Sequence, residues 1–148
     1  MKHGRNLVFV RTKVMMRNLC CLERVMPPHS PRIPEELCLQ QSQRQLVVRF
    51  TDGCTFSLPC EYLRVYSPSA AVRGHGLGQA ILESQKANVN IVAIEPVGHY
   101  AVKLVFDDDH DSGLYTWDYL YELGEQHRVL WERYLARLAA AGKSRNPD

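Results

Sequence analysis

The sequence contains no continuous apolar run of the roughly 20 residues that a membrane-spanning helix requires. It also begins without the basic, apolar and small-residue regions of a signal peptide. Its five cysteines are odd in number and irregularly spaced, which is not the pattern of a disulfide-stapled secreted domain. We therefore expect a cytoplasmic protein with reduced thiols and no membrane partner.

An excess of charge of one sign is also lacking. The 18 basic side chains nearly balance the 16 acidic ones and leave a formal net charge of +2, too little to attract nucleic acid by bulk electrostatics. The 45% hydrophobic and 23% charged fractions are ordinary for a globular protein. A chain of 148 residues suffices for one domain. We expect one folded domain and no nucleic-acid partner.

Signatures of catalysis are missing as well. No serine stands in a Gly-x-Ser-x-Gly elbow, and no Cys/His pair has supporting context. A non-haem iron oxygenase needs two histidines and a carboxylate, usually starting with His-x-Asp or His-x-Glu. None of the six histidines is followed two places later by an acid. We therefore expect that the chain is not an enzyme.

The distribution of residues predicts three regions. Residues 1–30 form a basic leader that ends in a proline-rich break and that we expect to be poorly ordered. Residues 31–141 form the domain, and residues 142–148 form a tail. A start of the working protein near Met26 is one explanation of the leader, and a presequence-like or membrane-surface role is another.

The clearest strand pattern lies between residues 46 and 58. Leu46, Val48 and Phe50 alternate with other residues, as the period of a strand requires. Asp52-Gly53 is typical of a tight hairpin turn, after which the alternation resumes. We predict a hairpin, followed by a short helix whose first turn contains Pro59.

The rest of the chain predicts two more strands, at 89–94 and 100–106, with a turn at 95–99 between them. In the second strand, Tyr100 should share a face with Val102, and a brief helix is expected at 79–86. A short strand near 114–115 leads to an amphipathic helix that Thr116 caps, that is interrupted near Gly124 and that ends at Gly142. The predicted fold class is therefore α+β, a small and mostly antiparallel sheet with the C-terminal helix packed on it.

The acidic turn at 107–113 is a candidate metal site. Asp109, His110 and Asp111 offer oxygen and nitrogen ligands for iron or zinc. The spacing does not match a calcium loop, and by itself it favours a solvated hairpin turn over a metal site. Cys54 and Cys60 could approach each other, but a structural zinc site normally has four ligands in closely spaced pairs. We therefore expect packed or half-buried thiols instead of a zinc site.

A glycine-rich segment at 74–78 is a candidate binding surface. Its backbone could approach an anion, but it does not follow a strand as a dinucleotide-binding loop must. Conformationally demanding loops often contact partners. We therefore predict a partner-binding patch composed of Arg64, Tyr66, Ser67, Arg73, His75, Glu95 and His99.

Several runs of the sequence agree in order and spacing with a known family. They are residues 50–53 (FTDG), 58–69 (LPCEYLRVYSPS), 73–76 (RGHG), 94–102 (IEPVGHYAV), 106–108 (FDD) and 117–120 (WDYL). Together they resemble the bacterial DUF971 family, which is similar to the N-terminal domain of γ-butyrobetaine hydroxylase. The resemblance covers about residues 31–138.

The resemblance also carries expectations about metal. In the eukaryotic hydroxylases this domain binds a structural zinc through three cysteines and a histidine, and the resemblance places Ser67, Ser69 and Val72 at the cysteine positions and His110 at the histidine position. The serine hydroxyls and the valine side chain at these positions cannot replace cysteine thiolates as zinc ligands. The resemblance therefore implies that this chain folds without that zinc. The iron-bearing oxygenase domain would follow Leu138, where ten residues remain.

Similar domains occur fused to Mrp/ApbC-like NTPases that carry iron–sulphur clusters. The resemblance thus implies a protein partner, an NTPase of this kind or a metalloenzyme, and a supporting role in cluster or metalloenzyme maturation. We expect a non-catalytic accessory module without a resident cofactor. The rival hypothesis is a metal-binding protein that holds iron or zinc through His110 and its neighbouring carboxylates.

Overall fold

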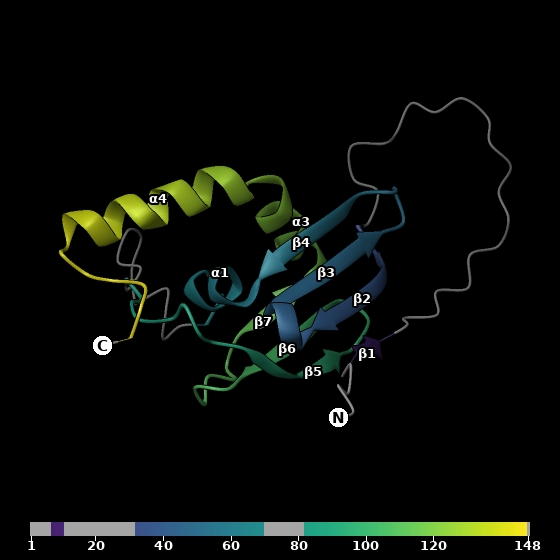
Figure 1. Ribbon diagram of the computed structural model, residues 1–148. Helices are drawn as coiled ribbons and strands as arrows, with labels where there is room; N and C mark the ends of the chain where they lie inside the picture. Colours follow the sequence, from purple (N-terminus) through teal and green to yellow (C-terminus); the bar gives the residue numbers. More distant parts are fainter. Residues whose placement is uncertain (1–6, 11–31, 70–81, 148) are drawn as a thin grey trace, which may run out of the picture.

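The computed structural model describes residues 7–10, 32–69 and 82–147. These residues form two antiparallel sheets and three α-helices, so the predicted α+β class is confirmed. The first sheet has the order β1-β2-β3-β4 (Figure 1). Its strands are β1 (Leu7–Val10), β2 (Pro34–Gln40), β3 (Gln45–Phe50) and β4 (Thr55–Pro59). The second sheet has the order β5-β6-β7.

Strand β1 comes from the basic segment at 1–30 that the sequence marks as a leader. It pairs with β2 in antiparallel register, Val8 opposite Leu39. These four residues of the predicted leader are therefore part of the sheet. The rest of that segment lies outside the described residues.

The predicted hairpin is present as β3 and β4. Leu46 and Val48 are fully buried on one face of β3, as their alternation predicted. In the turn, Gly53 has a φ of +89°, which residues with a side chain rarely adopt. The Asp52 carboxylate accepts a hydrogen bond of 2.9 Å from the Cys54 amide and so stabilises the turn.

The second sheet differs from its prediction. It consists of β5 (Ile91–Val97), β6 (Ala101–Phe106) and β7 (Leu114–Thr116). The expected turn at 95–99 was wrong in part, because residues 95–97 continue β5 and the turn occupies residues 98–100. Pro96 is tolerated because β5 is an edge strand, where a missing amide need not break the ladder. Tyr100 lies in that turn and is 56% exposed, so it does not share the buried face of Val102.

The helices are α1 (Cys60–Val65), α3 (Trp117–Glu125) and α4 (His127–Ala140). Pro59 is the residue before α1 rather than part of its first turn. The Thr116 hydroxyl accepts a hydrogen bond from the Tyr119 amide, which confirms the predicted cap. The break after Gly124 and the end at Gly142, whose φ is +63°, are also confirmed. The helix expected at 79–86 is wrong for its described part, because residues 82–86 are irregular.

The main core lies between the two sheets and is closed by α1 and α3 (Figure 1). Its fully buried residues include Leu37, Leu39, Leu46, Leu58, Ile91, Leu104, Tyr115 and Leu120. A smaller cluster joins α4 to α1 through Val65, Tyr134 and Leu138. Buried tyrosines need a partner for their hydroxyls, and Tyr62 donates to the Leu123 carbonyl at 2.7 Å. This hydrogen bond joins α1 to α3.

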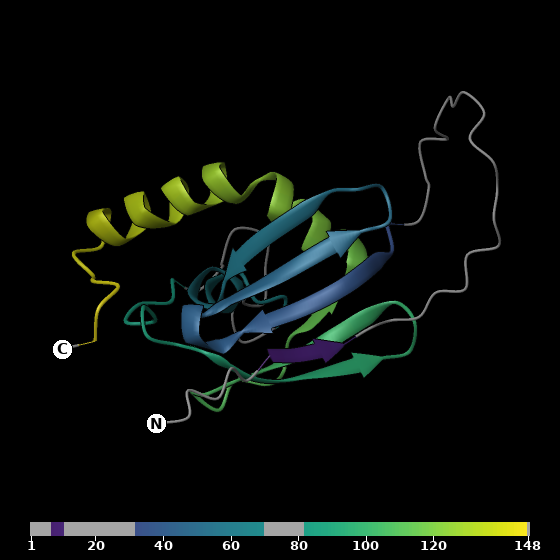
Figure 2. The same ribbon diagram turned by 45° about the vertical axis from the view of Figure 1, so that its right-hand side comes forward.

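Helix α4 lies on the outside of the molecule. Both views show it above α1 and extending past the strands, with the C-terminal segment turning back from its end (Figures 1 and 2). Of the helices in the described ranges, none combines the length and the apolar character that crossing a bilayer demands. The sheets and α1 therefore form the body on which α4 rests.

Gly124 packs closely against the Phe56 ring. A Cβ at this position would overlap the Phe56 ring. Alanine normally stabilises a helix by about 1 kcal/mol relative to glycine, but here we expect Gly124→Ala to lower the free energy of unfolding by about 1–3 kcal/mol through overpacking. Chemical denaturation followed by tryptophan fluorescence measures this change. In a Phe56→Ala background the same substitution should be neutral or stabilising, and equal losses in both backgrounds would contradict the packing argument.

Candidate functional site

Two segments that the sequence treats as separate candidate sites are in contact. The end of α1 and the residues after it, 64–69, lie against the turn that follows β6, 107–113. Residues 83–86 approach the same place from a third direction. We call this contact the polar junction, and define it as Arg64, Ser67, Ser69, Glu83, Lys86, Asp108, His110 and Ser112.

A buried guanidinium lies at the centre of the polar junction. Arg64 is only 7% exposed. Its Nε lies 2.9 Å from Asp108 Oδ2, and its NH1 lies 3.4 Å from Glu83 Oε1 without hydrogen-bond geometry. Lys86 Nζ lies 2.8 Å from the same Asp108 oxygen. Two cations and two carboxylates therefore neutralise one another where water has little access.

The charges of the junction act on Asp108. Burial by itself would raise the pKa of this carboxyl, but the hydrogen bonds and charges of Lys86 and Arg64 outweigh it and hold the pKa below its ordinary 3.8. Asp108 therefore stays ionised at neutral pH and forms ion pairs with Arg64 and Lys86.

Ser67 and His110 form the second half of the junction. Ser67 Oγ and His110 Nε2 share a hydrogen bond of 2.9 Å, and Ser69 Oγ lies 2.7 Å from Ser112 Oγ. Burial and the nearby Arg64 lower the pKa of His110, so its imidazole is neutral at pH 7. A serine beside a neutral histidine suggests nucleophilic chemistry, but Ser67 is only 1% exposed, so its hydroxyl is shielded from solvent in this structure. A Cβ at Gly113 would also overlap this hydroxyl.

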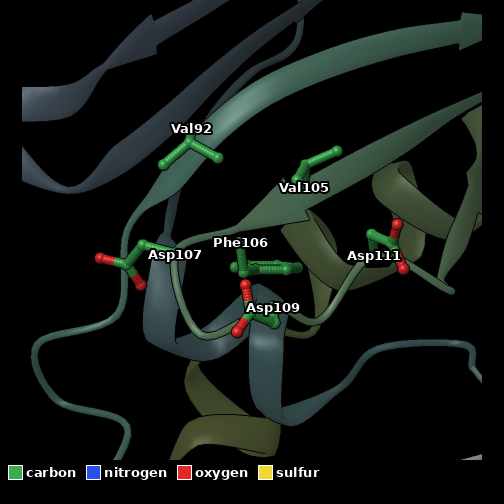
Figure 3. A pocket seen from close by; sticks show the side chains of 6 residues that line it. All are labelled: Val92, Val105, Phe106, Asp107, Asp109 and Asp111. Carbon is green, nitrogen blue, oxygen red and sulfur yellow. The ribbon is translucent and has the colours of Figure 1, made fainter.

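The predicted metal ligands of the acidic turn do not converge. Asp107, Asp109 and Asp111 line a shallow pocket of about 390 Å³ together with Phe106 and two valines. Figure 3 shows the three carboxylates spread around Phe106 instead of pointing to a common centre. His110 turns away from them to Ser67. In residues 7–10, 32–69 and 82–147, no three His, Cys, Asp or Glu side chains are placed to hold a metal ion.

The residues at the zinc positions of the resemblance do not fit zinc either. Ser67 and Ser69 supply hydroxyls, which are hydrogen-bonded to His110 and Ser112. Zinc in structural sites is held by thiolates and imidazoles. Val72 lies outside the described residues. The described part of this site is a hydrogen-bonded cluster and not a thiolate cage.

The thiols are packed separately. Cys60 is buried and donates to Asn90 Oδ1 at 3.6 Å, while Cys54 is half-buried beside the Tyr121 hydroxyl at 3.3 Å. Burial raises the pKa of Cys60 to about 11, so it stays protonated. This confirms the interpretation of Cys54 and Cys60 as packed thiols.

The predicted partner-binding patch is not one continuous surface. Arg64 and Ser67 are buried in the junction, and the Tyr66 hydroxyl donates to the Leu130 carbonyl at 2.7 Å. Glu95 and His99 are exposed, but His99 precedes β6 whereas the junction follows it. Six residues of strand span about 20 Å, so these exposed members lie apart from the buried ones. Arg73 and His75 lie outside the described residues.

Sequence reasoning missed the partners that complete the junction. Glu83, Lys86 and Asp108 were not assigned to Arg64, because Asp108 is 44 positions away from it and no periodic pattern joins them. The available signal was indirect: an arginine in a short apolar helix needs a nearby carboxylate if that helix is buried. Burial was the information that the sequence lacked.

The junction generates a prediction about charge. We expect Asp108→Asn to lower the free energy of unfolding by about 2 kcal/mol at neutral pH, because the buried Arg64 loses its anion. The loss should be smaller than for a fully enclosed pair, because the Asp108 side chain is 22% exposed. Since the pKa of Asp108 is lowered from 3.8, this contribution is full above that value and disappears as the pH falls through the folded-state pKa. Denaturation at pH 7 and at a series of pH values below 3.8 measures the loss and its disappearance.

Asp109→Asn is the matched control for this prediction. It lies in the same turn, forms no ion pair in the described part of the chain, and has a φ of +65° that asparagine tolerates well. It should change stability by less than about 0.5 kcal/mol. Equal losses from the two variants would mean that the turn, and not the ion pair, is responsible.

Comparison with known proteins places this architecture in a family. The family model for the N-terminal domain of γ-butyrobetaine hydroxylase-like proteins matches residues 37–121. That model describes an N-terminal domain and not the oxygenase domain. No curated protein matches the chain.

Solved structures agree with this match. Two structures described as NMR solution structures share 53% identity with the chain at a TM-score of 0.70, and the alignments cover 79% and 84% of this chain and 92% of each of theirs. A crystal structure at 1.93 Å of a protein of unknown function from Acidithiobacillus ferrooxidans ATCC 23270, described as a member of the DUF971 family, shares 37% identity at a TM-score of 0.52. That alignment covers 62% of this chain and 91% of the other. With its matching model over residues 37–121 and these relatives, the chain belongs to the γ-butyrobetaine hydroxylase-like N-terminal family, also called DUF971.

Proposed function

We propose that the chain is a non-catalytic protein-interaction module. The observation that carries this proposal is the state of its chemistry-bearing side chains: Arg64, Ser67 and Asp108 are buried or bonded within the junction. A group that is already neutralised and shielded from solvent is not available as a nucleophile or general base. Function is then left to surfaces, and the outer face of the second sheet is the strongest candidate among the described residues.

The outer face of β5-β6-β7 exposes apolar side chains. Val92 is 51% exposed and Leu114 is 43% exposed, although both lie in strands. Val92 and Val105 line the pocket beside the acidic turn, above Phe106 (Figure 3). Apolar residues grouped beside a pocket favour a contact with another protein over simple solvation.

The charge around this face indicates its occupant. Asp109 and Asp111 at the pocket form no ion pair with any described residue. The cation Lys103 is already paired with Glu95 at 2.6 Å. We therefore propose a partner surface that combines an apolar side chain with lysine or arginine, because unpaired carboxylates favour cations at the rim of an interface.

The family suggests a finer role. Similar domains are fused to Mrp/ApbC-like NTPases, and we propose on that basis that the partner is an NTPase of this kind or a metalloenzyme in the maturation of iron–sulphur clusters. A cytoplasmic setting is part of the proposal, because the described cysteines Cys38, Cys54 and Cys60 are free thiols.

Substitution of Val92 tests the docking face. A tagged chain is expressed in its native host, and its co-purifying proteins are compared with those of Val92→Asp and of Val129→Asp, which alters an equally exposed valine, at 49%, on α4. We expect Val92→Asp to reduce the recovery of the main partner about tenfold or more, as for an interface centre, and Val129→Asp to retain it.

Combined Asp109→Asn and Asp111→Asn should weaken the purified complex and reduce its salt dependence. Full recovery with Val92→Asp, with the fold intact by circular dichroism, would contradict this docking face.

Metal binding is the second candidate function. The observation that favours it is the neutral imidazole of His110 next to an acidic turn, since neutral histidine is the form that binds metal. We expect the tag-free protein to retain no stoichiometric iron or zinc, and a chelator to change its melting temperature by less than about 1 °C. Elemental analysis and thermal unfolding measure this. One equivalent of metal in the wild type, absent from His110→Ala, would establish the metal-binding function instead.

A further inference from the structure

The C-terminal segment lies against Glu61 of α1 and against Trp131 and Tyr134 of α4, away from the proposed docking face. We call these three residues the recess. Residues 143–146 turn back from the end of α4 (Figures 1 and 2). Two backbone hydrogen bonds hold the segment, from the Gln85 amide to the Ser144 carbonyl at 2.9 Å and from the Ala87 amide to the Arg145 carbonyl at 3.0 Å. The sequence predicts a tail at 142–148, and the structure places part of that tail against the domain.

Arg145 inserts its guanidinium into the recess. Its Nε and NH2 atoms donate to the two oxygens of Glu61 at 2.9 and 2.7 Å, which is a bidentate pair. Its central carbon also lies 4.9 Å from the centroid of a Trp131 ring. The planar guanidinium of arginine can donate two parallel hydrogen bonds to one carboxylate while it lies against an aromatic ring, and the ammonium of lysine cannot.

The recess contains one buried polar atom without a well-formed hydrogen bond. Tyr134 is fully buried, and its hydroxyl lies near Glu61 but has no partner with hydrogen-bond geometry among the described residues. Burial and the charge of Glu61 raise the pKa of Tyr134 to about 12, so the hydroxyl is protonated at neutral pH. Glu61 itself is 6% exposed. A buried carboxylate and an unpartnered hydroxyl together form a site built for a hydrogen-bonding cation.

The helices that carry the recess are packed more firmly than the C-terminal segment that covers it. Glu61 and Tyr134 belong to α1 and α4, which pack together through Val65 and Leu138. The segment that fills the recess is exposed at every described residue from 141 to 147, and the Arg145 side chain is 43% exposed. Segments with few buried contacts open at a lower free energy than the elements they cover. We therefore expect the segment to open before α1 and α4 separate.

We propose that Glu61, Trp131 and Tyr134 form a guanidinium-binding site in which Arg145 is a replaceable self-ligand. Its external ligand is an arginine in an extended segment of a partner protein. The seated segment itself shows the required chemistry: one guanidinium for Glu61 and two carbonyls for the Gln85 and Ala87 amides. An anionic ligand is ruled out by the buried carboxylate. This site is separate from the outer face of β5-β6-β7 and does not depend on it.

The test uses the full chain with Arg145→Ala and a synthetic peptide with the sequence of residues 142–147. We expect the peptide to bind this variant at least about tenfold more tightly than it binds the wild type, as seen by NMR shifts of the Trp131 indole and the Gln85 and Ala87 amides. A peptide with lysine in place of the arginine should bind about tenfold more weakly. The double variant Glu61→Gln/Arg145→Ala should not bind either peptide.

A second measurement needs no variant. In the wild-type chain, hydrogen exchange at the Gln85 and Ala87 amides should proceed through local opening, faster than at the buried amides of α1. Exchange of these amides only through global unfolding would overturn the proposal, because the segment would then be a permanent part of the core. Equal peptide binding by the wild type and Arg145→Ala, or equal binding of the arginine and lysine peptides, would overturn it as well.

Discussion

The burial of a guanidinium is the constraint on which the rest of this structure depends. Arg64 lies at the end of a six-residue helix whose residues are all buried. A buried charge without a partner costs several kcal/mol, so the chain must bring carboxylates to it. Asp108 comes from the turn after β6 and Glu83 from the segment before β5. The requirement for neutralisation thereby joins α1 to the second sheet and fixes the turn at 107–113.

The same constraint decides where function can reside. Side chains that would suggest a catalytic or metal site in isolation, such as Ser67 and His110, are used to satisfy one another inside the polar junction. Among the described residues, surfaces of two kinds remain as candidates for recognition. One is an apolar sheet face with an acidic rim around Val92. The other is a recess at Glu61 that already holds an arginine of the chain itself. Both surfaces are preformed in the fold, and both are the basis of the proposed partner binding.

Elements that depend on neighbouring residues were predicted correctly, whereas elements that depend on distant contacts were not. The hairpin at Asp52-Gly53, the cap at Thr116 and the helix end at Gly142 depend on neighbouring residues, and all three are confirmed. Residues 95–97 were predicted as a turn from their proline and glycine context, but pairing with β6 extends the strand through Pro96. The prediction for residues 79–86 relied on local propensity, and its described part is irregular because its side chains and backbone are bound to Asp108 and to the C-terminal segment. Tertiary contacts outweigh propensity at such places.

The sequence by itself determined the α+β class, the family and the absence of a recognisable catalytic motif, since these depend on periodicity, turn residues and short motifs. Tertiary structure alone decided which polar residues are buried and which partners they meet. Arg64 and Asp108 are 44 positions apart, and Glu61 and Arg145 are 84 positions apart. The energy of a charged group depends on its solvent exposure and on the charges within a few ångströms of it. Both quantities arise only when distant segments are folded together.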